Sequence, residues 1–479
     1  MPPARTSGTL ERSIPAPEDV YEGRILHQGR IIPAELGVAD GRIVALRPSV
    51  SGGRRHPLGE RILLPSATDV HVHFRDPSPP EEFEGFGAGT LQAVHGGVGA
   101  VVDMPNTQPP VDSLEHLEEK EDHTRHRLQC DVLLYALLGT RTPIESLAER
   151  VGGFKLYLAP TTGSPETPGW EELPGLLERV AATQLPLHVH AEDPGLFREP
   201  SQALDPPGWD AARPLESEIE SLKRLLPGPP GLKLHIAHVT ARATLEQARD
   251  AGVSAEATPH HLLLSAMAGA DARWKTNPPL RSEPVRAGLY EAFCGGGVPM
   301  LASDHAPHPR EAKERPFPLA PSGVPGVETS LPLLLAEVRA SRLPLQTLLA
   351  AACRRPARFL GLPRGELAVG WEANFLAVDF RERRRVQGKE LHGPFGWTPF
   401  EGFEAIFPDF HWLRGELLLD DGEAVGTASG RILRPGDLPE PPARRPLTGT
   451  LAEGPREAGA EAGEPLTPRR PPGPWPRES

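Results

Sequence analysis

The chain has 479 residues, 38% of them hydrophobic, and its formal net charge is -13. With its 49 Gly added, the apolar share is that of an ordinary globular protein, which excludes a collagen-like or wholly disordered chain. The acidic balance and the lack of a long Lys/Arg block exclude nucleic acid as a partner, so an anionic ligand requires a local cluster of cations or a metal.

The beginning of the chain changes character at Glu22. Residues 1–21 are polar and Pro-rich and predict a disordered leader. Residues 22–64 contain short alternating runs, GRILHQGRII and DGRIVAL, with a turn at ADG. We therefore expect the first part of a small β-rich domain.

Residues 65–360 alternate between apolar β-runs and amphipathic stretches, which predicts βα units and a parallel sheet. Helical stretches such as SLEHLEEKEDHTRHRL and SEIESLKRLL fall between the runs. The eight runs are ERILLPSATDV, GAVVDM, DVLLYALL, GFKLYL, LPLHVH, LKLHIAH, VSAEATPHH and VPMLASDH. Eight units predict an α/β fold of the (β/α)₈ TIM-like barrel class.

Short strands return in residues 361–434, in GELAVGWEANFLAVDF and HWLRGELLLDDG. This second β-segment can join the first as one discontinuous β-rich domain, because the ends of a barrel can lie close together. Residues 435–479 contain 12 Pro and 6 Gly and predict a disordered tail.

The three cysteines, Cys130, Cys294 and Cys353, lie far apart and lack CxxC spacing. They predict neither a disulfide framework nor a thiolate zinc site, and a reducing cytoplasm fits them best. The chain has no run of 18 apolar residues and no apolar segment near its first residue, so we expect a soluble protein with no membrane partner.

Candidate functional residues fall at the carboxyl ends of the predicted strands, the face on which barrel enzymes build active sites. His71 and His73 close the first run, and their period-2 spacing places both on one strand face, able to bind one metal ion. An isolated HxH pair is only weak evidence, because 18 His make such pairs common by chance. The repetition of polar residues at other strand ends strengthens the metal interpretation.

Lys155 lies inside the apolar run GFKLYL, where burial of an ammonium group is costly. One interpretation is a side chain that reaches outward to solvent. The other is a neutral amine that has reacted with carbon dioxide to give a carbamate, an anion able to bridge two metals. The chain has only seven Lys against 44 Arg, which makes an incidental buried Lys less expected.

Three further strand ends carry possible ligands. His190 and His238 follow the fifth and sixth runs, and Asp304 follows the eighth. Each has an ordinary alternative, a hydrogen-bonded histidine or a helix-capping aspartate. Four imidazoles, one carboxylate and one bridging anion suit two zinc-like ions, which can activate water and polarise a carbonyl. The implied reaction is metal-assisted hydrolysis, with Asp304 as general base.

These motifs together resemble the cyclic amidohydrolases, a family within the metal-dependent hydrolases, and among them the dihydroorotases. The resemblance runs from Glu22 to Asp437 and rests on DVHVHFRDP, VVDMPNT, GFKLYL, HVHAED, HIAHVT, TPHHL, KTNPPLR and ASDHAPH. It implies a barrel with a small flanking β-domain and two Zn²⁺ ions per chain. The implied ligands are His71 and His73 on one ion, His190 and His238 on the other, carbamylated Lys155 between them, and Asp304.

The implied reaction is the reversible, zinc-dependent interconversion of L-dihydroorotate and N-carbamoyl-L-aspartate in de novo pyrimidine biosynthesis. Such a substrate requires a group that binds its carboxylate. Arg75 lies two residues beyond the HxH pair, on the same face by the strand period, and offers a bidentate guanidinium. The resemblance adds Asn106 and His308 on the same carboxylate, Asn277 on the ring, and the loop around Gly323 over it. Each of three residues also has an ordinary alternative: Arg75 as part of an ion pair at the rim, Asn106 as a turn residue and His308 as a loop residue.

Some alternatives stay open at this point. His188 shares a strand face with His190, and His235 precedes His238, so the ligand within each pair can be either residue. Allantoinases and hydantoinases share the metal pattern, although the Arg75 position favours a substrate with a carboxylate. A rival of another class is an inactive scaffold for aspartate transcarbamoylase. We also expect a homo-oligomer and leave the identity of the metal undetermined.

Overall fold

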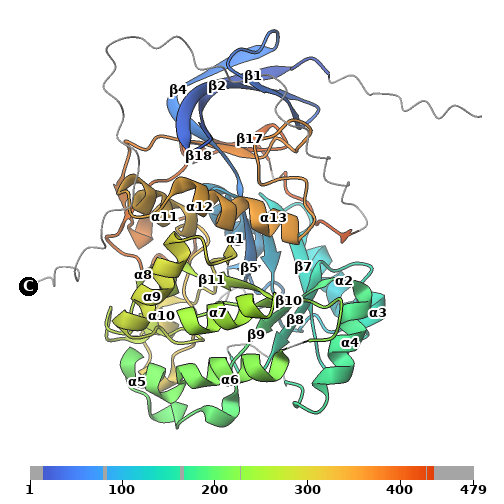
Figure 1. Cartoon of the computed structure of the whole chain (residues 1–479), viewed down its shortest axis with the longest axis vertical. Helices are drawn as coiled ribbons and strands as arrows, with labels where there is room; N and C mark the ends of the chain where they lie inside the picture. Colours follow the sequence, from blue (N-terminus) through green and yellow to red (C-terminus); the bar gives the residue numbers. More distant parts are fainter. Residues whose placement is uncertain (1–14, 79–83, 162–166, 227, 428, 436–479) are drawn as a thin grey trace, which may run out of the picture.

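The computed structural model describes residues 15–78, 84–161, 167–226, 228–427 and 429–435. Two eight-stranded sheets dominate it (Figure 1), one in the body of the molecule and one at its end. The first described strand begins at Asp19, so the chain enters regular structure three residues before the predicted boundary at Glu22. Most of the predicted leader, and the predicted tail beyond residue 435, lie outside the described residues.

The body of the molecule is the predicted barrel. Its strands run in chain order around the sheet and all of the pairs are parallel. A parallel bridge between Val72 and His305 joins the first strand to the segment after the last, which closes the ring. The strands are β5 (Ala67–Val72), β6 (Val98–Asp103), β7 (Asp131–Leu137), β8 (Gly153–Tyr157), β9 (Pro186–His190), β10 (Lys233–Ile236), β11 (Ser254–Ala257) and β12 (Met300–Leu301).

Helices surround this ring, and strands such as β6 are buried on both faces, as parallel strands under helices are. Ser113 caps α2 by accepting a hydrogen bond from the backbone of His116. In α6, acidic residues occupy the first turn and basic residues the last, which suits the helix dipole. The helices are α1 (Gly85–His95), α2 (Leu114–Thr124), α3 (Ile144–Leu147), α4 (Leu173–Thr183), α5 (Pro206–Ala212), α6 (Leu215–Leu225), α7 (Arg242–Asp250), α8 (Pro259–Leu263), α9 (Glu283–Cys294), α10 (Arg310–Lys313), α11 (Ser330–Arg339), α12 (Leu345–Leu349) and α13 (Arg355–Phe359).

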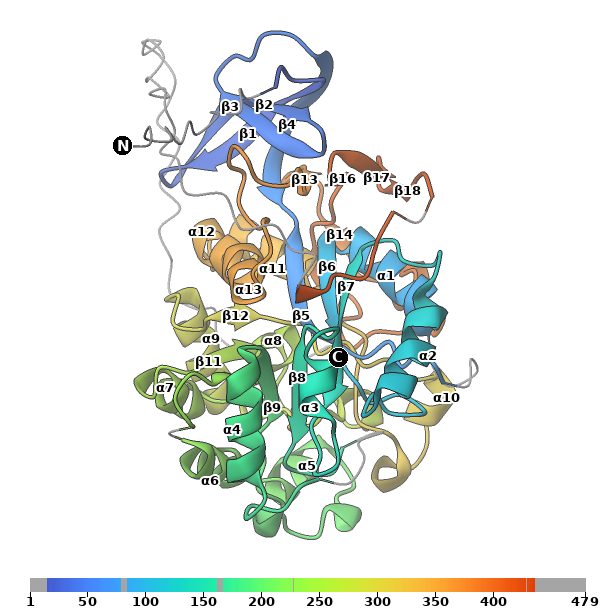
Figure 2. The same ribbon diagram turned by 90° about the vertical axis from the view of Figure 1, so that its right-hand side faces the viewer.

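The second sheet combines strands from both ends of the chain, which confirms the predicted discontinuous β-domain. Antiparallel pairing of β4 with β13 joins the two halves, and Figure 2 shows them together beyond one end of the barrel. Its strands are β1 (Asp19–His27), β2 (Arg30–Ala39), β3 (Arg42–Arg47), β4 (Arg54–Pro65), β13 (Phe375–Val378), β16 (Phe410–Leu413), β17 (Glu416–Asp420) and β18 (Glu423–Ala424). The short strands β14 (Arg384–Arg385) and β15 (Glu404–Ala405) pair separately.

The structure corrects the extent of three predicted runs. ERILLPSATDV is divided between the two sheets, because β4 ends at Pro65 and β5 begins at Ala67. VSAEATPHH is a strand only to Ala257, and its two histidines belong to α8, which Pro259 begins. VPMLASDH contributes only two strand residues.

Buried polar groups connect the β-domain to helix α1 and to the link between the two sheets. The fully buried His411 of β16 donates from Nδ1 to the carbonyl of Val94 at 2.9 Å, and its Nε2 lies 3.0 Å from the hydroxyl of Ser66. Burial lowers the pKa of His411 to about 4, so the ring is neutral at pH 7. Within the described ranges, no helix is both long and apolar enough to span a bilayer.

Candidate active site

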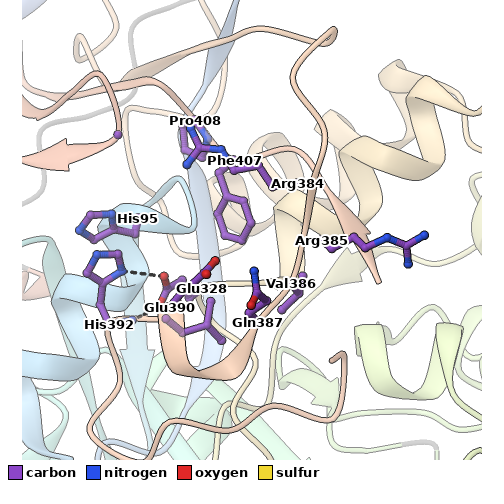
Figure 3. Close-up of a pocket in the computed structure, with 12 residues that line it drawn as sticks. His95, Glu328, Arg384, Arg385, Val386, Gln387, Glu390, His392, Phe407 and Pro408 are labelled. Carbon is purple, nitrogen blue, oxygen red and sulfur yellow. Dashed lines mark hydrogen bonds and ion pairs between the residues drawn. The ribbon is translucent and has the colours of Figure 1, made fainter. Parts of the chain in front are cut away.

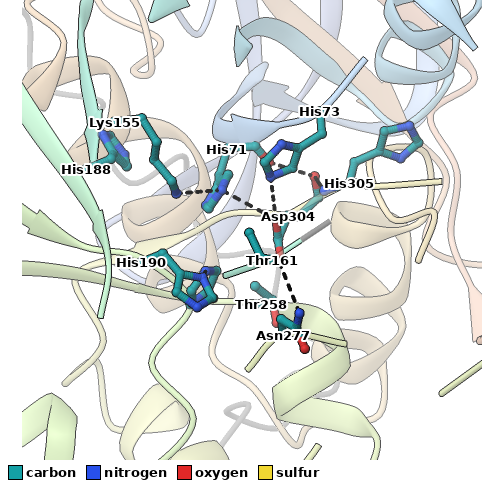
Figure 4. Close-up of polar contacts among 12 residues, drawn as sticks. His71, His73, Lys155, Thr161, His188, His190, Thr258, Asn277, Asp304 and His305 are labelled. Atoms are coloured by element: carbon teal, nitrogen blue, oxygen red, sulfur yellow. Dashed lines mark hydrogen bonds and ion pairs between the residues drawn. The ribbon is translucent and has the colours of Figure 1, made fainter. Parts of the chain in front are cut away.

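All but one of the predicted functional residues line a single cavity of about 30 Å³ at the carboxyl ends of the barrel strands. Figure 4 shows how His71, His73, Lys155 and Asp304 lie relative to one another. The residues lining it include His71, His73, Arg75, Asn106, Lys155, His190, His238, Asn277, Asp304 and Gly323. His308 lies behind this wall, where its Nε2 donates to the carbonyl of Ser322 at 3.0 Å and its Nδ1 is 3.5 Å from the Arg75 guanidinium. Residues more than 230 positions apart in the chain therefore share one cavity.

His71, His73 and Asp304 form a group whose possible ligand atoms all lie within 4.8 Å of one another. The Nε2 of His73 is 3.0 Å from the Asp304 Oδ1, and the Nε2 of His71 is 3.4 Å from the same oxygen. A tetrahedral ion with bonds of about 2.0–2.1 Å holds its ligand atoms roughly 3.3 Å apart. The three side chains therefore have the spacing that one divalent ion requires.

In three of the histidines, the ring nitrogen that points away from the cavity also indicates a metal site. Each donates to a side-chain oxygen, which leaves a lone pair on the ring nitrogen that faces the cavity, as in metal-binding histidines. The pairs are His71 Nδ1 with Glu256 Oε1 at 2.5 Å, His73 Nδ1 with Asn106 Oδ1 at 2.6 Å, and His190 Nε2 with Glu192 Oε2 at 2.8 Å.

His190 and His238 form a second pair beside the first group. The Nδ1 of His190 lies 3.1 Å from the Nε2 of His238, and the other ring nitrogen of His238 is buried with no hydrogen-bond partner in the described part of the chain. The rings of His71 and His238 are stacked at 5.4 Å, so the two groups adjoin. The two facing nitrogens, one from each ring, lie close enough together for one cation to bind both.

Lys155 extends from β8 into the barrel and is fully buried, which rules out the outward-pointing interpretation. Its Nζ lies 3.0 Å from the Nε2 of His71 (Figure 4). Burial lowers the pKa of the Lys155 ammonium to about 8, which increases the fraction of neutral amine at physiological pH. A neutral amine is the form that reacts with carbon dioxide.

The electrostatic state of the cavity also suits a cation. Burial lowers the pKa of His73 to about 4, so its imidazole is neutral. Burial acts to raise the pKa of Asp304, but the neighbouring histidines His71, His73 and His260 outweigh burial and lower it, so the carboxyl is ionised. Neutral imidazoles and an ionised carboxylate are the protonation states that bind metal ions.

Three residues at the cavity have left-handed backbone conformations, which are costly for residues other than glycine. They are Arg75 at φ 54°, His238 at φ 37° and Asp304 at φ 46°. This corrects the reason given for Arg75. Strand β5 ends at Val72, so the strand period does not reach Arg75, and a change of backbone direction after the strand brings its side chain to the cavity.

Arg75 is buried, and its guanidinium donates to the carbonyl of Pro307 at 2.9 Å. Burial lowers the pKa of Arg75 to about 10, so the group is still charged at pH 7. In another part of the cavity wall, the amide nitrogen of Asn277 donates to the Thr161 hydroxyl at 3.1 Å, and its Oδ1 accepts from the Trp209 indole at 3.2 Å. A fixed cation and an oriented carboxamide thus border the ligand group.

The sequence left open which histidine of each pair reaches the cavity, and the structure distinguishes the two members. His188 and His235 precede His190 and His238 and lie deeper in the barrel, where the ring of Phe359 packs against both. With Glu256 they form a second possible ligand group, but neither is among the described residues that line the cavity. His190 and His238 are the members that reach it.

Glu256 was not predicted as a functional residue. It is fully buried on β11, where its Oε1 accepts from His71 and its Oε2 accepts from the Nε2 of His235 at 2.9 Å. Burial acts to raise the pKa of this carboxyl, but its interactions with both histidines outweigh burial and hold the pKa well below its usual range. The signal in the sequence was a lone carboxylate inside the apolar run VSAEA, the same kind of signal that identified Lys155.

A second cavity, of about 90 Å³, is lined by a different set of residues, shown in Figure 3. Its wall includes the rings of His95 and His392, stacked at 3.4 Å, and Glu328, whose carboxylate accepts from the Nδ1 of His392 at 2.7 Å. Although this cavity is larger, none of the predicted ligands is among the described residues that line it. The smaller cavity is the one at which the possible metal ligands converge.

The chain is similar to known proteins over most of its length. Residues 62–402 match the amidohydrolase family. The chain is 34% identical to the dihydroorotase of Pyrococcus abyssi over 430 residues, which cover 88% of this chain and 100% of that one. It is 32% identical to the dihydroorotase of Thermoplasma acidophilum over 415 residues, covering 85% and 96% of the two chains.

Solved structures agree with the observed fold. The L-hydantoinase (dihydropyrimidinase) of Arthrobacter aurescens superposes with a TM-score of 0.81 at 26% identity, over 87% of this chain and 100% of that one. The D-hydantoinase of a Thermus species superposes with a TM-score of 0.77 at 21% identity, over 87% and 98%, which supports the fold alone.

Proposed function

Because the chain belongs to the amidohydrolase family, we propose that it is a dihydroorotase, which interconverts L-dihydroorotate and N-carbamoyl-L-aspartate. The observation that carries the proposal is Arg75, a buried cation on the wall of the same cavity as the histidine and aspartate group. Dihydroorotate has one carboxylate beside its cyclic amide. A guanidinium is the side chain that binds such a group with two parallel hydrogen bonds.

We propose that His71, His73 and Asp304 hold one divalent ion and that His190 and His238 hold a second, with Zn²⁺ the expected metal. Lys155 would join them as a carbamate, formed when its neutral amine adds to carbon dioxide and releases one proton. Support comes from the spacing of the ligand atoms and from the outer hydrogen bonds that keep the inner nitrogens unprotonated. When bound, the ions generate hydroxide from water near neutral pH and polarise the carbonyl.

In hydrolysis, a carbon–oxygen bond forms at the ring carbonyl and the carbon–nitrogen bond of the ring amide breaks. Asp304 accepts the proton of the attacking water and transfers it to the leaving nitrogen. Arg75 holds the substrate carboxylate together with Asn106 and His308, and Asn277 and the backbone at Gly323 orient the ring. Cyclisation reverses these steps and begins with Asp304 protonated, so lower pH favours it.

The test is an assay of the purified, metal-loaded protein with dihydroorotate, allantoin and hydantoin in parallel. We expect dihydroorotate to be hydrolysed with the highest kcat/KM, because allantoin and hydantoin offer no carboxylate to Arg75. Preferential hydrolysis of either of them would overturn the proposed substrate. Analysis of metal content on the same preparation distinguishes an enzyme, with about two ions per chain, from an inactive scaffold with none.

Roles in de novo pyrimidine biosynthesis and in the cytoplasm follow from this activity as parts of the same proposal. Self-assembly and association with aspartate transcarbamoylase stay predictions. Size-exclusion chromatography with light scattering, with and without that partner, measures both.

A further inference from the structure

Two buried lysines, Lys275 and Lys313, lie directly behind the wall of the catalytic cavity. They are only 4% and 1% exposed. Lys275 is two residues from Asn277 in the chain, and the Nζ of Lys313 donates to the carbonyl of Gly323 at 2.8 Å. Asn277 and Gly323 both line the cavity, so Lys313 binds the backbone of one wall residue and Lys275 precedes another by two positions.

The two ammonium groups fix the loop that borders the cavity. Lys275 donates to the carbonyls of Phe317, Pro318 and Ala320 at 2.8, 3.3 and 2.9 Å. Lys313 donates to the carbonyls of Lys275 and Pro321, at 3.2 and 2.9 Å, as well as to Gly323. Since Ser322 accepts from His308, charged or ring donors hold nearly every carbonyl from residue 317 to residue 323.

The charges of these lysines are not neutralised locally. Within the described ranges, no ion pair with a carboxylate within 4.0 Å is found for either one. Asp271 is the nearby acid that acts on Lys313, and it is bound by Arg273. Burial lowers the pKa of Lys275 to about 8, and burial together with the charges of Lys275 and Arg75 lowers the pKa of Lys313.

Carbonyl oxygens would satisfy these ammonium groups without a nearby acid, but the accumulation of like charge still costs free energy. A bound anion relieves that cost, since its negative charge attracts Arg75, Lys275 and Lys313 through poorly solvated protein. The overall charge of -13 repels anions, so a local cationic wall is what allows one to bind.

We propose that Lys275 and Lys313 are specificity-determining residues that make the cavity select ligands with a free carboxylate over neutral cyclic ureides. The inference rests on the proposed function and extends it from Arg75, which touches the carboxylate, to two positioning residues behind the wall. They act by their charge on the bound anion and by holding the Ser322–Gly323 segment.

The experiment compares two ligands that share a ring but differ in charge, the anion dihydroorotate and the neutral dihydrouracil. KM is measured for dihydroorotate, and Ki for dihydrouracil as a competitive inhibitor. For Lys313→Met and Lys275→Met we expect KM to rise about tenfold while Ki changes less than twofold. The exposed Lys389 supplies the matched control, because Lys389→Met also removes one positive charge but should change neither constant.

The ratio of KM for dihydroorotate to Ki for dihydrouracil distinguishes an effect of the lysine charge from an effect of a less ordered loop. A loop that is only less ordered would weaken the binding of both ligands to the same extent. That result would overturn the proposal, and so would an unchanged KM. If the Met variants do not fold, Lys313→Arg and Lys275→Arg decide, because they keep the charge. Retention of the wild-type ratio supports the proposal and its loss refutes it. Failure of wild-type protein to turn over dihydroorotate would instead refute the proposed function.

Discussion

Replacing Glu256 by Gln removes one negative charge from the barrel interior with almost no change in shape. Glu256 accepts hydrogen bonds from His71 and His235 with its two oxygens, and it thereby keeps the proton of His71 on Nδ1. The Nε2 lone pair of His71 then faces the cavity. We expect the variant to fold but to bind metal more weakly.

The magnitude follows from the hydrogen bonds that Gln can keep. Its single oxygen can serve His71 only if its amide group faces His235, whose proton must then move to Nδ1, toward the Ser254 hydroxyl 3.0 Å away. One charge-assisted hydrogen bond, worth about 1.5–3 kcal/mol, is lost in either orientation. This corresponds to a loss of about 10- to 100-fold in metal affinity, the usual effect of removing such an outer partner.

The assay titrates metal-free protein with Zn²⁺ in competition with a chromophoric chelator, with thermal unfolding measured in parallel. Glu337→Gln is the matched control, because Glu337 is also a buried glutamate but pairs with Arg342 and Tyr290 on the outside of the barrel. It should leave Zn²⁺ affinity unchanged. A folded Glu256→Gln protein with wild-type affinity would refute the assigned role of this carboxylate.

Three further predictions test other parts of the structure. Asp304→Asn should lower kcat by at least about 10²-fold while Zn²⁺ content changes less; unchanged kcat would reject the general base. Arg75→Met removes about two charge-assisted hydrogen bonds and should lower kcat/KM for dihydroorotate by about 10²- to 10⁴-fold, with Arg75→Lys intermediate; a loss below threefold would contradict the carboxylate anchor. His411 has a pKa of about 4 when folded, against roughly 6.5 when unfolded, so the unfolded chain binds more protons between these values. The contribution of His411 to the free energy of unfolding is therefore complete above about pH 6.5 and falls by about 3 kcal/mol as the pH drops to 4. His411→Gln should flatten the pH dependence of the free energy of unfolding measured with denaturant. An equally steep dependence in the variant would contradict this role of His411.

Much of the candidate site could be predicted because its signals are local. Lys155 was identified by a charged residue in an apolar run, and His190 and Asp304 by their positions where such runs end. The same reasoning could have found Glu256, which stands inside VSAEA, but its partner His71 is 185 residues away and no local pattern connects them. Lys275 and Lys313 gave no signal, because their partners are backbone carbonyls of an irregular loop.

The order of strands, the barrel class and the residue types at the strand ends were determined by the sequence alone, since strand period and burial of apolar runs are properties of short segments. Only the tertiary structure decided that ERILLPSATDV divides between two sheets, that His190 rather than His188 reaches the cavity, and that Arg75 arrives there through a left-handed turn. These outcomes depend on closure of the ring and on contacts between residues far apart in the chain, which restrict each backbone to one of several conformations that its local sequence allows.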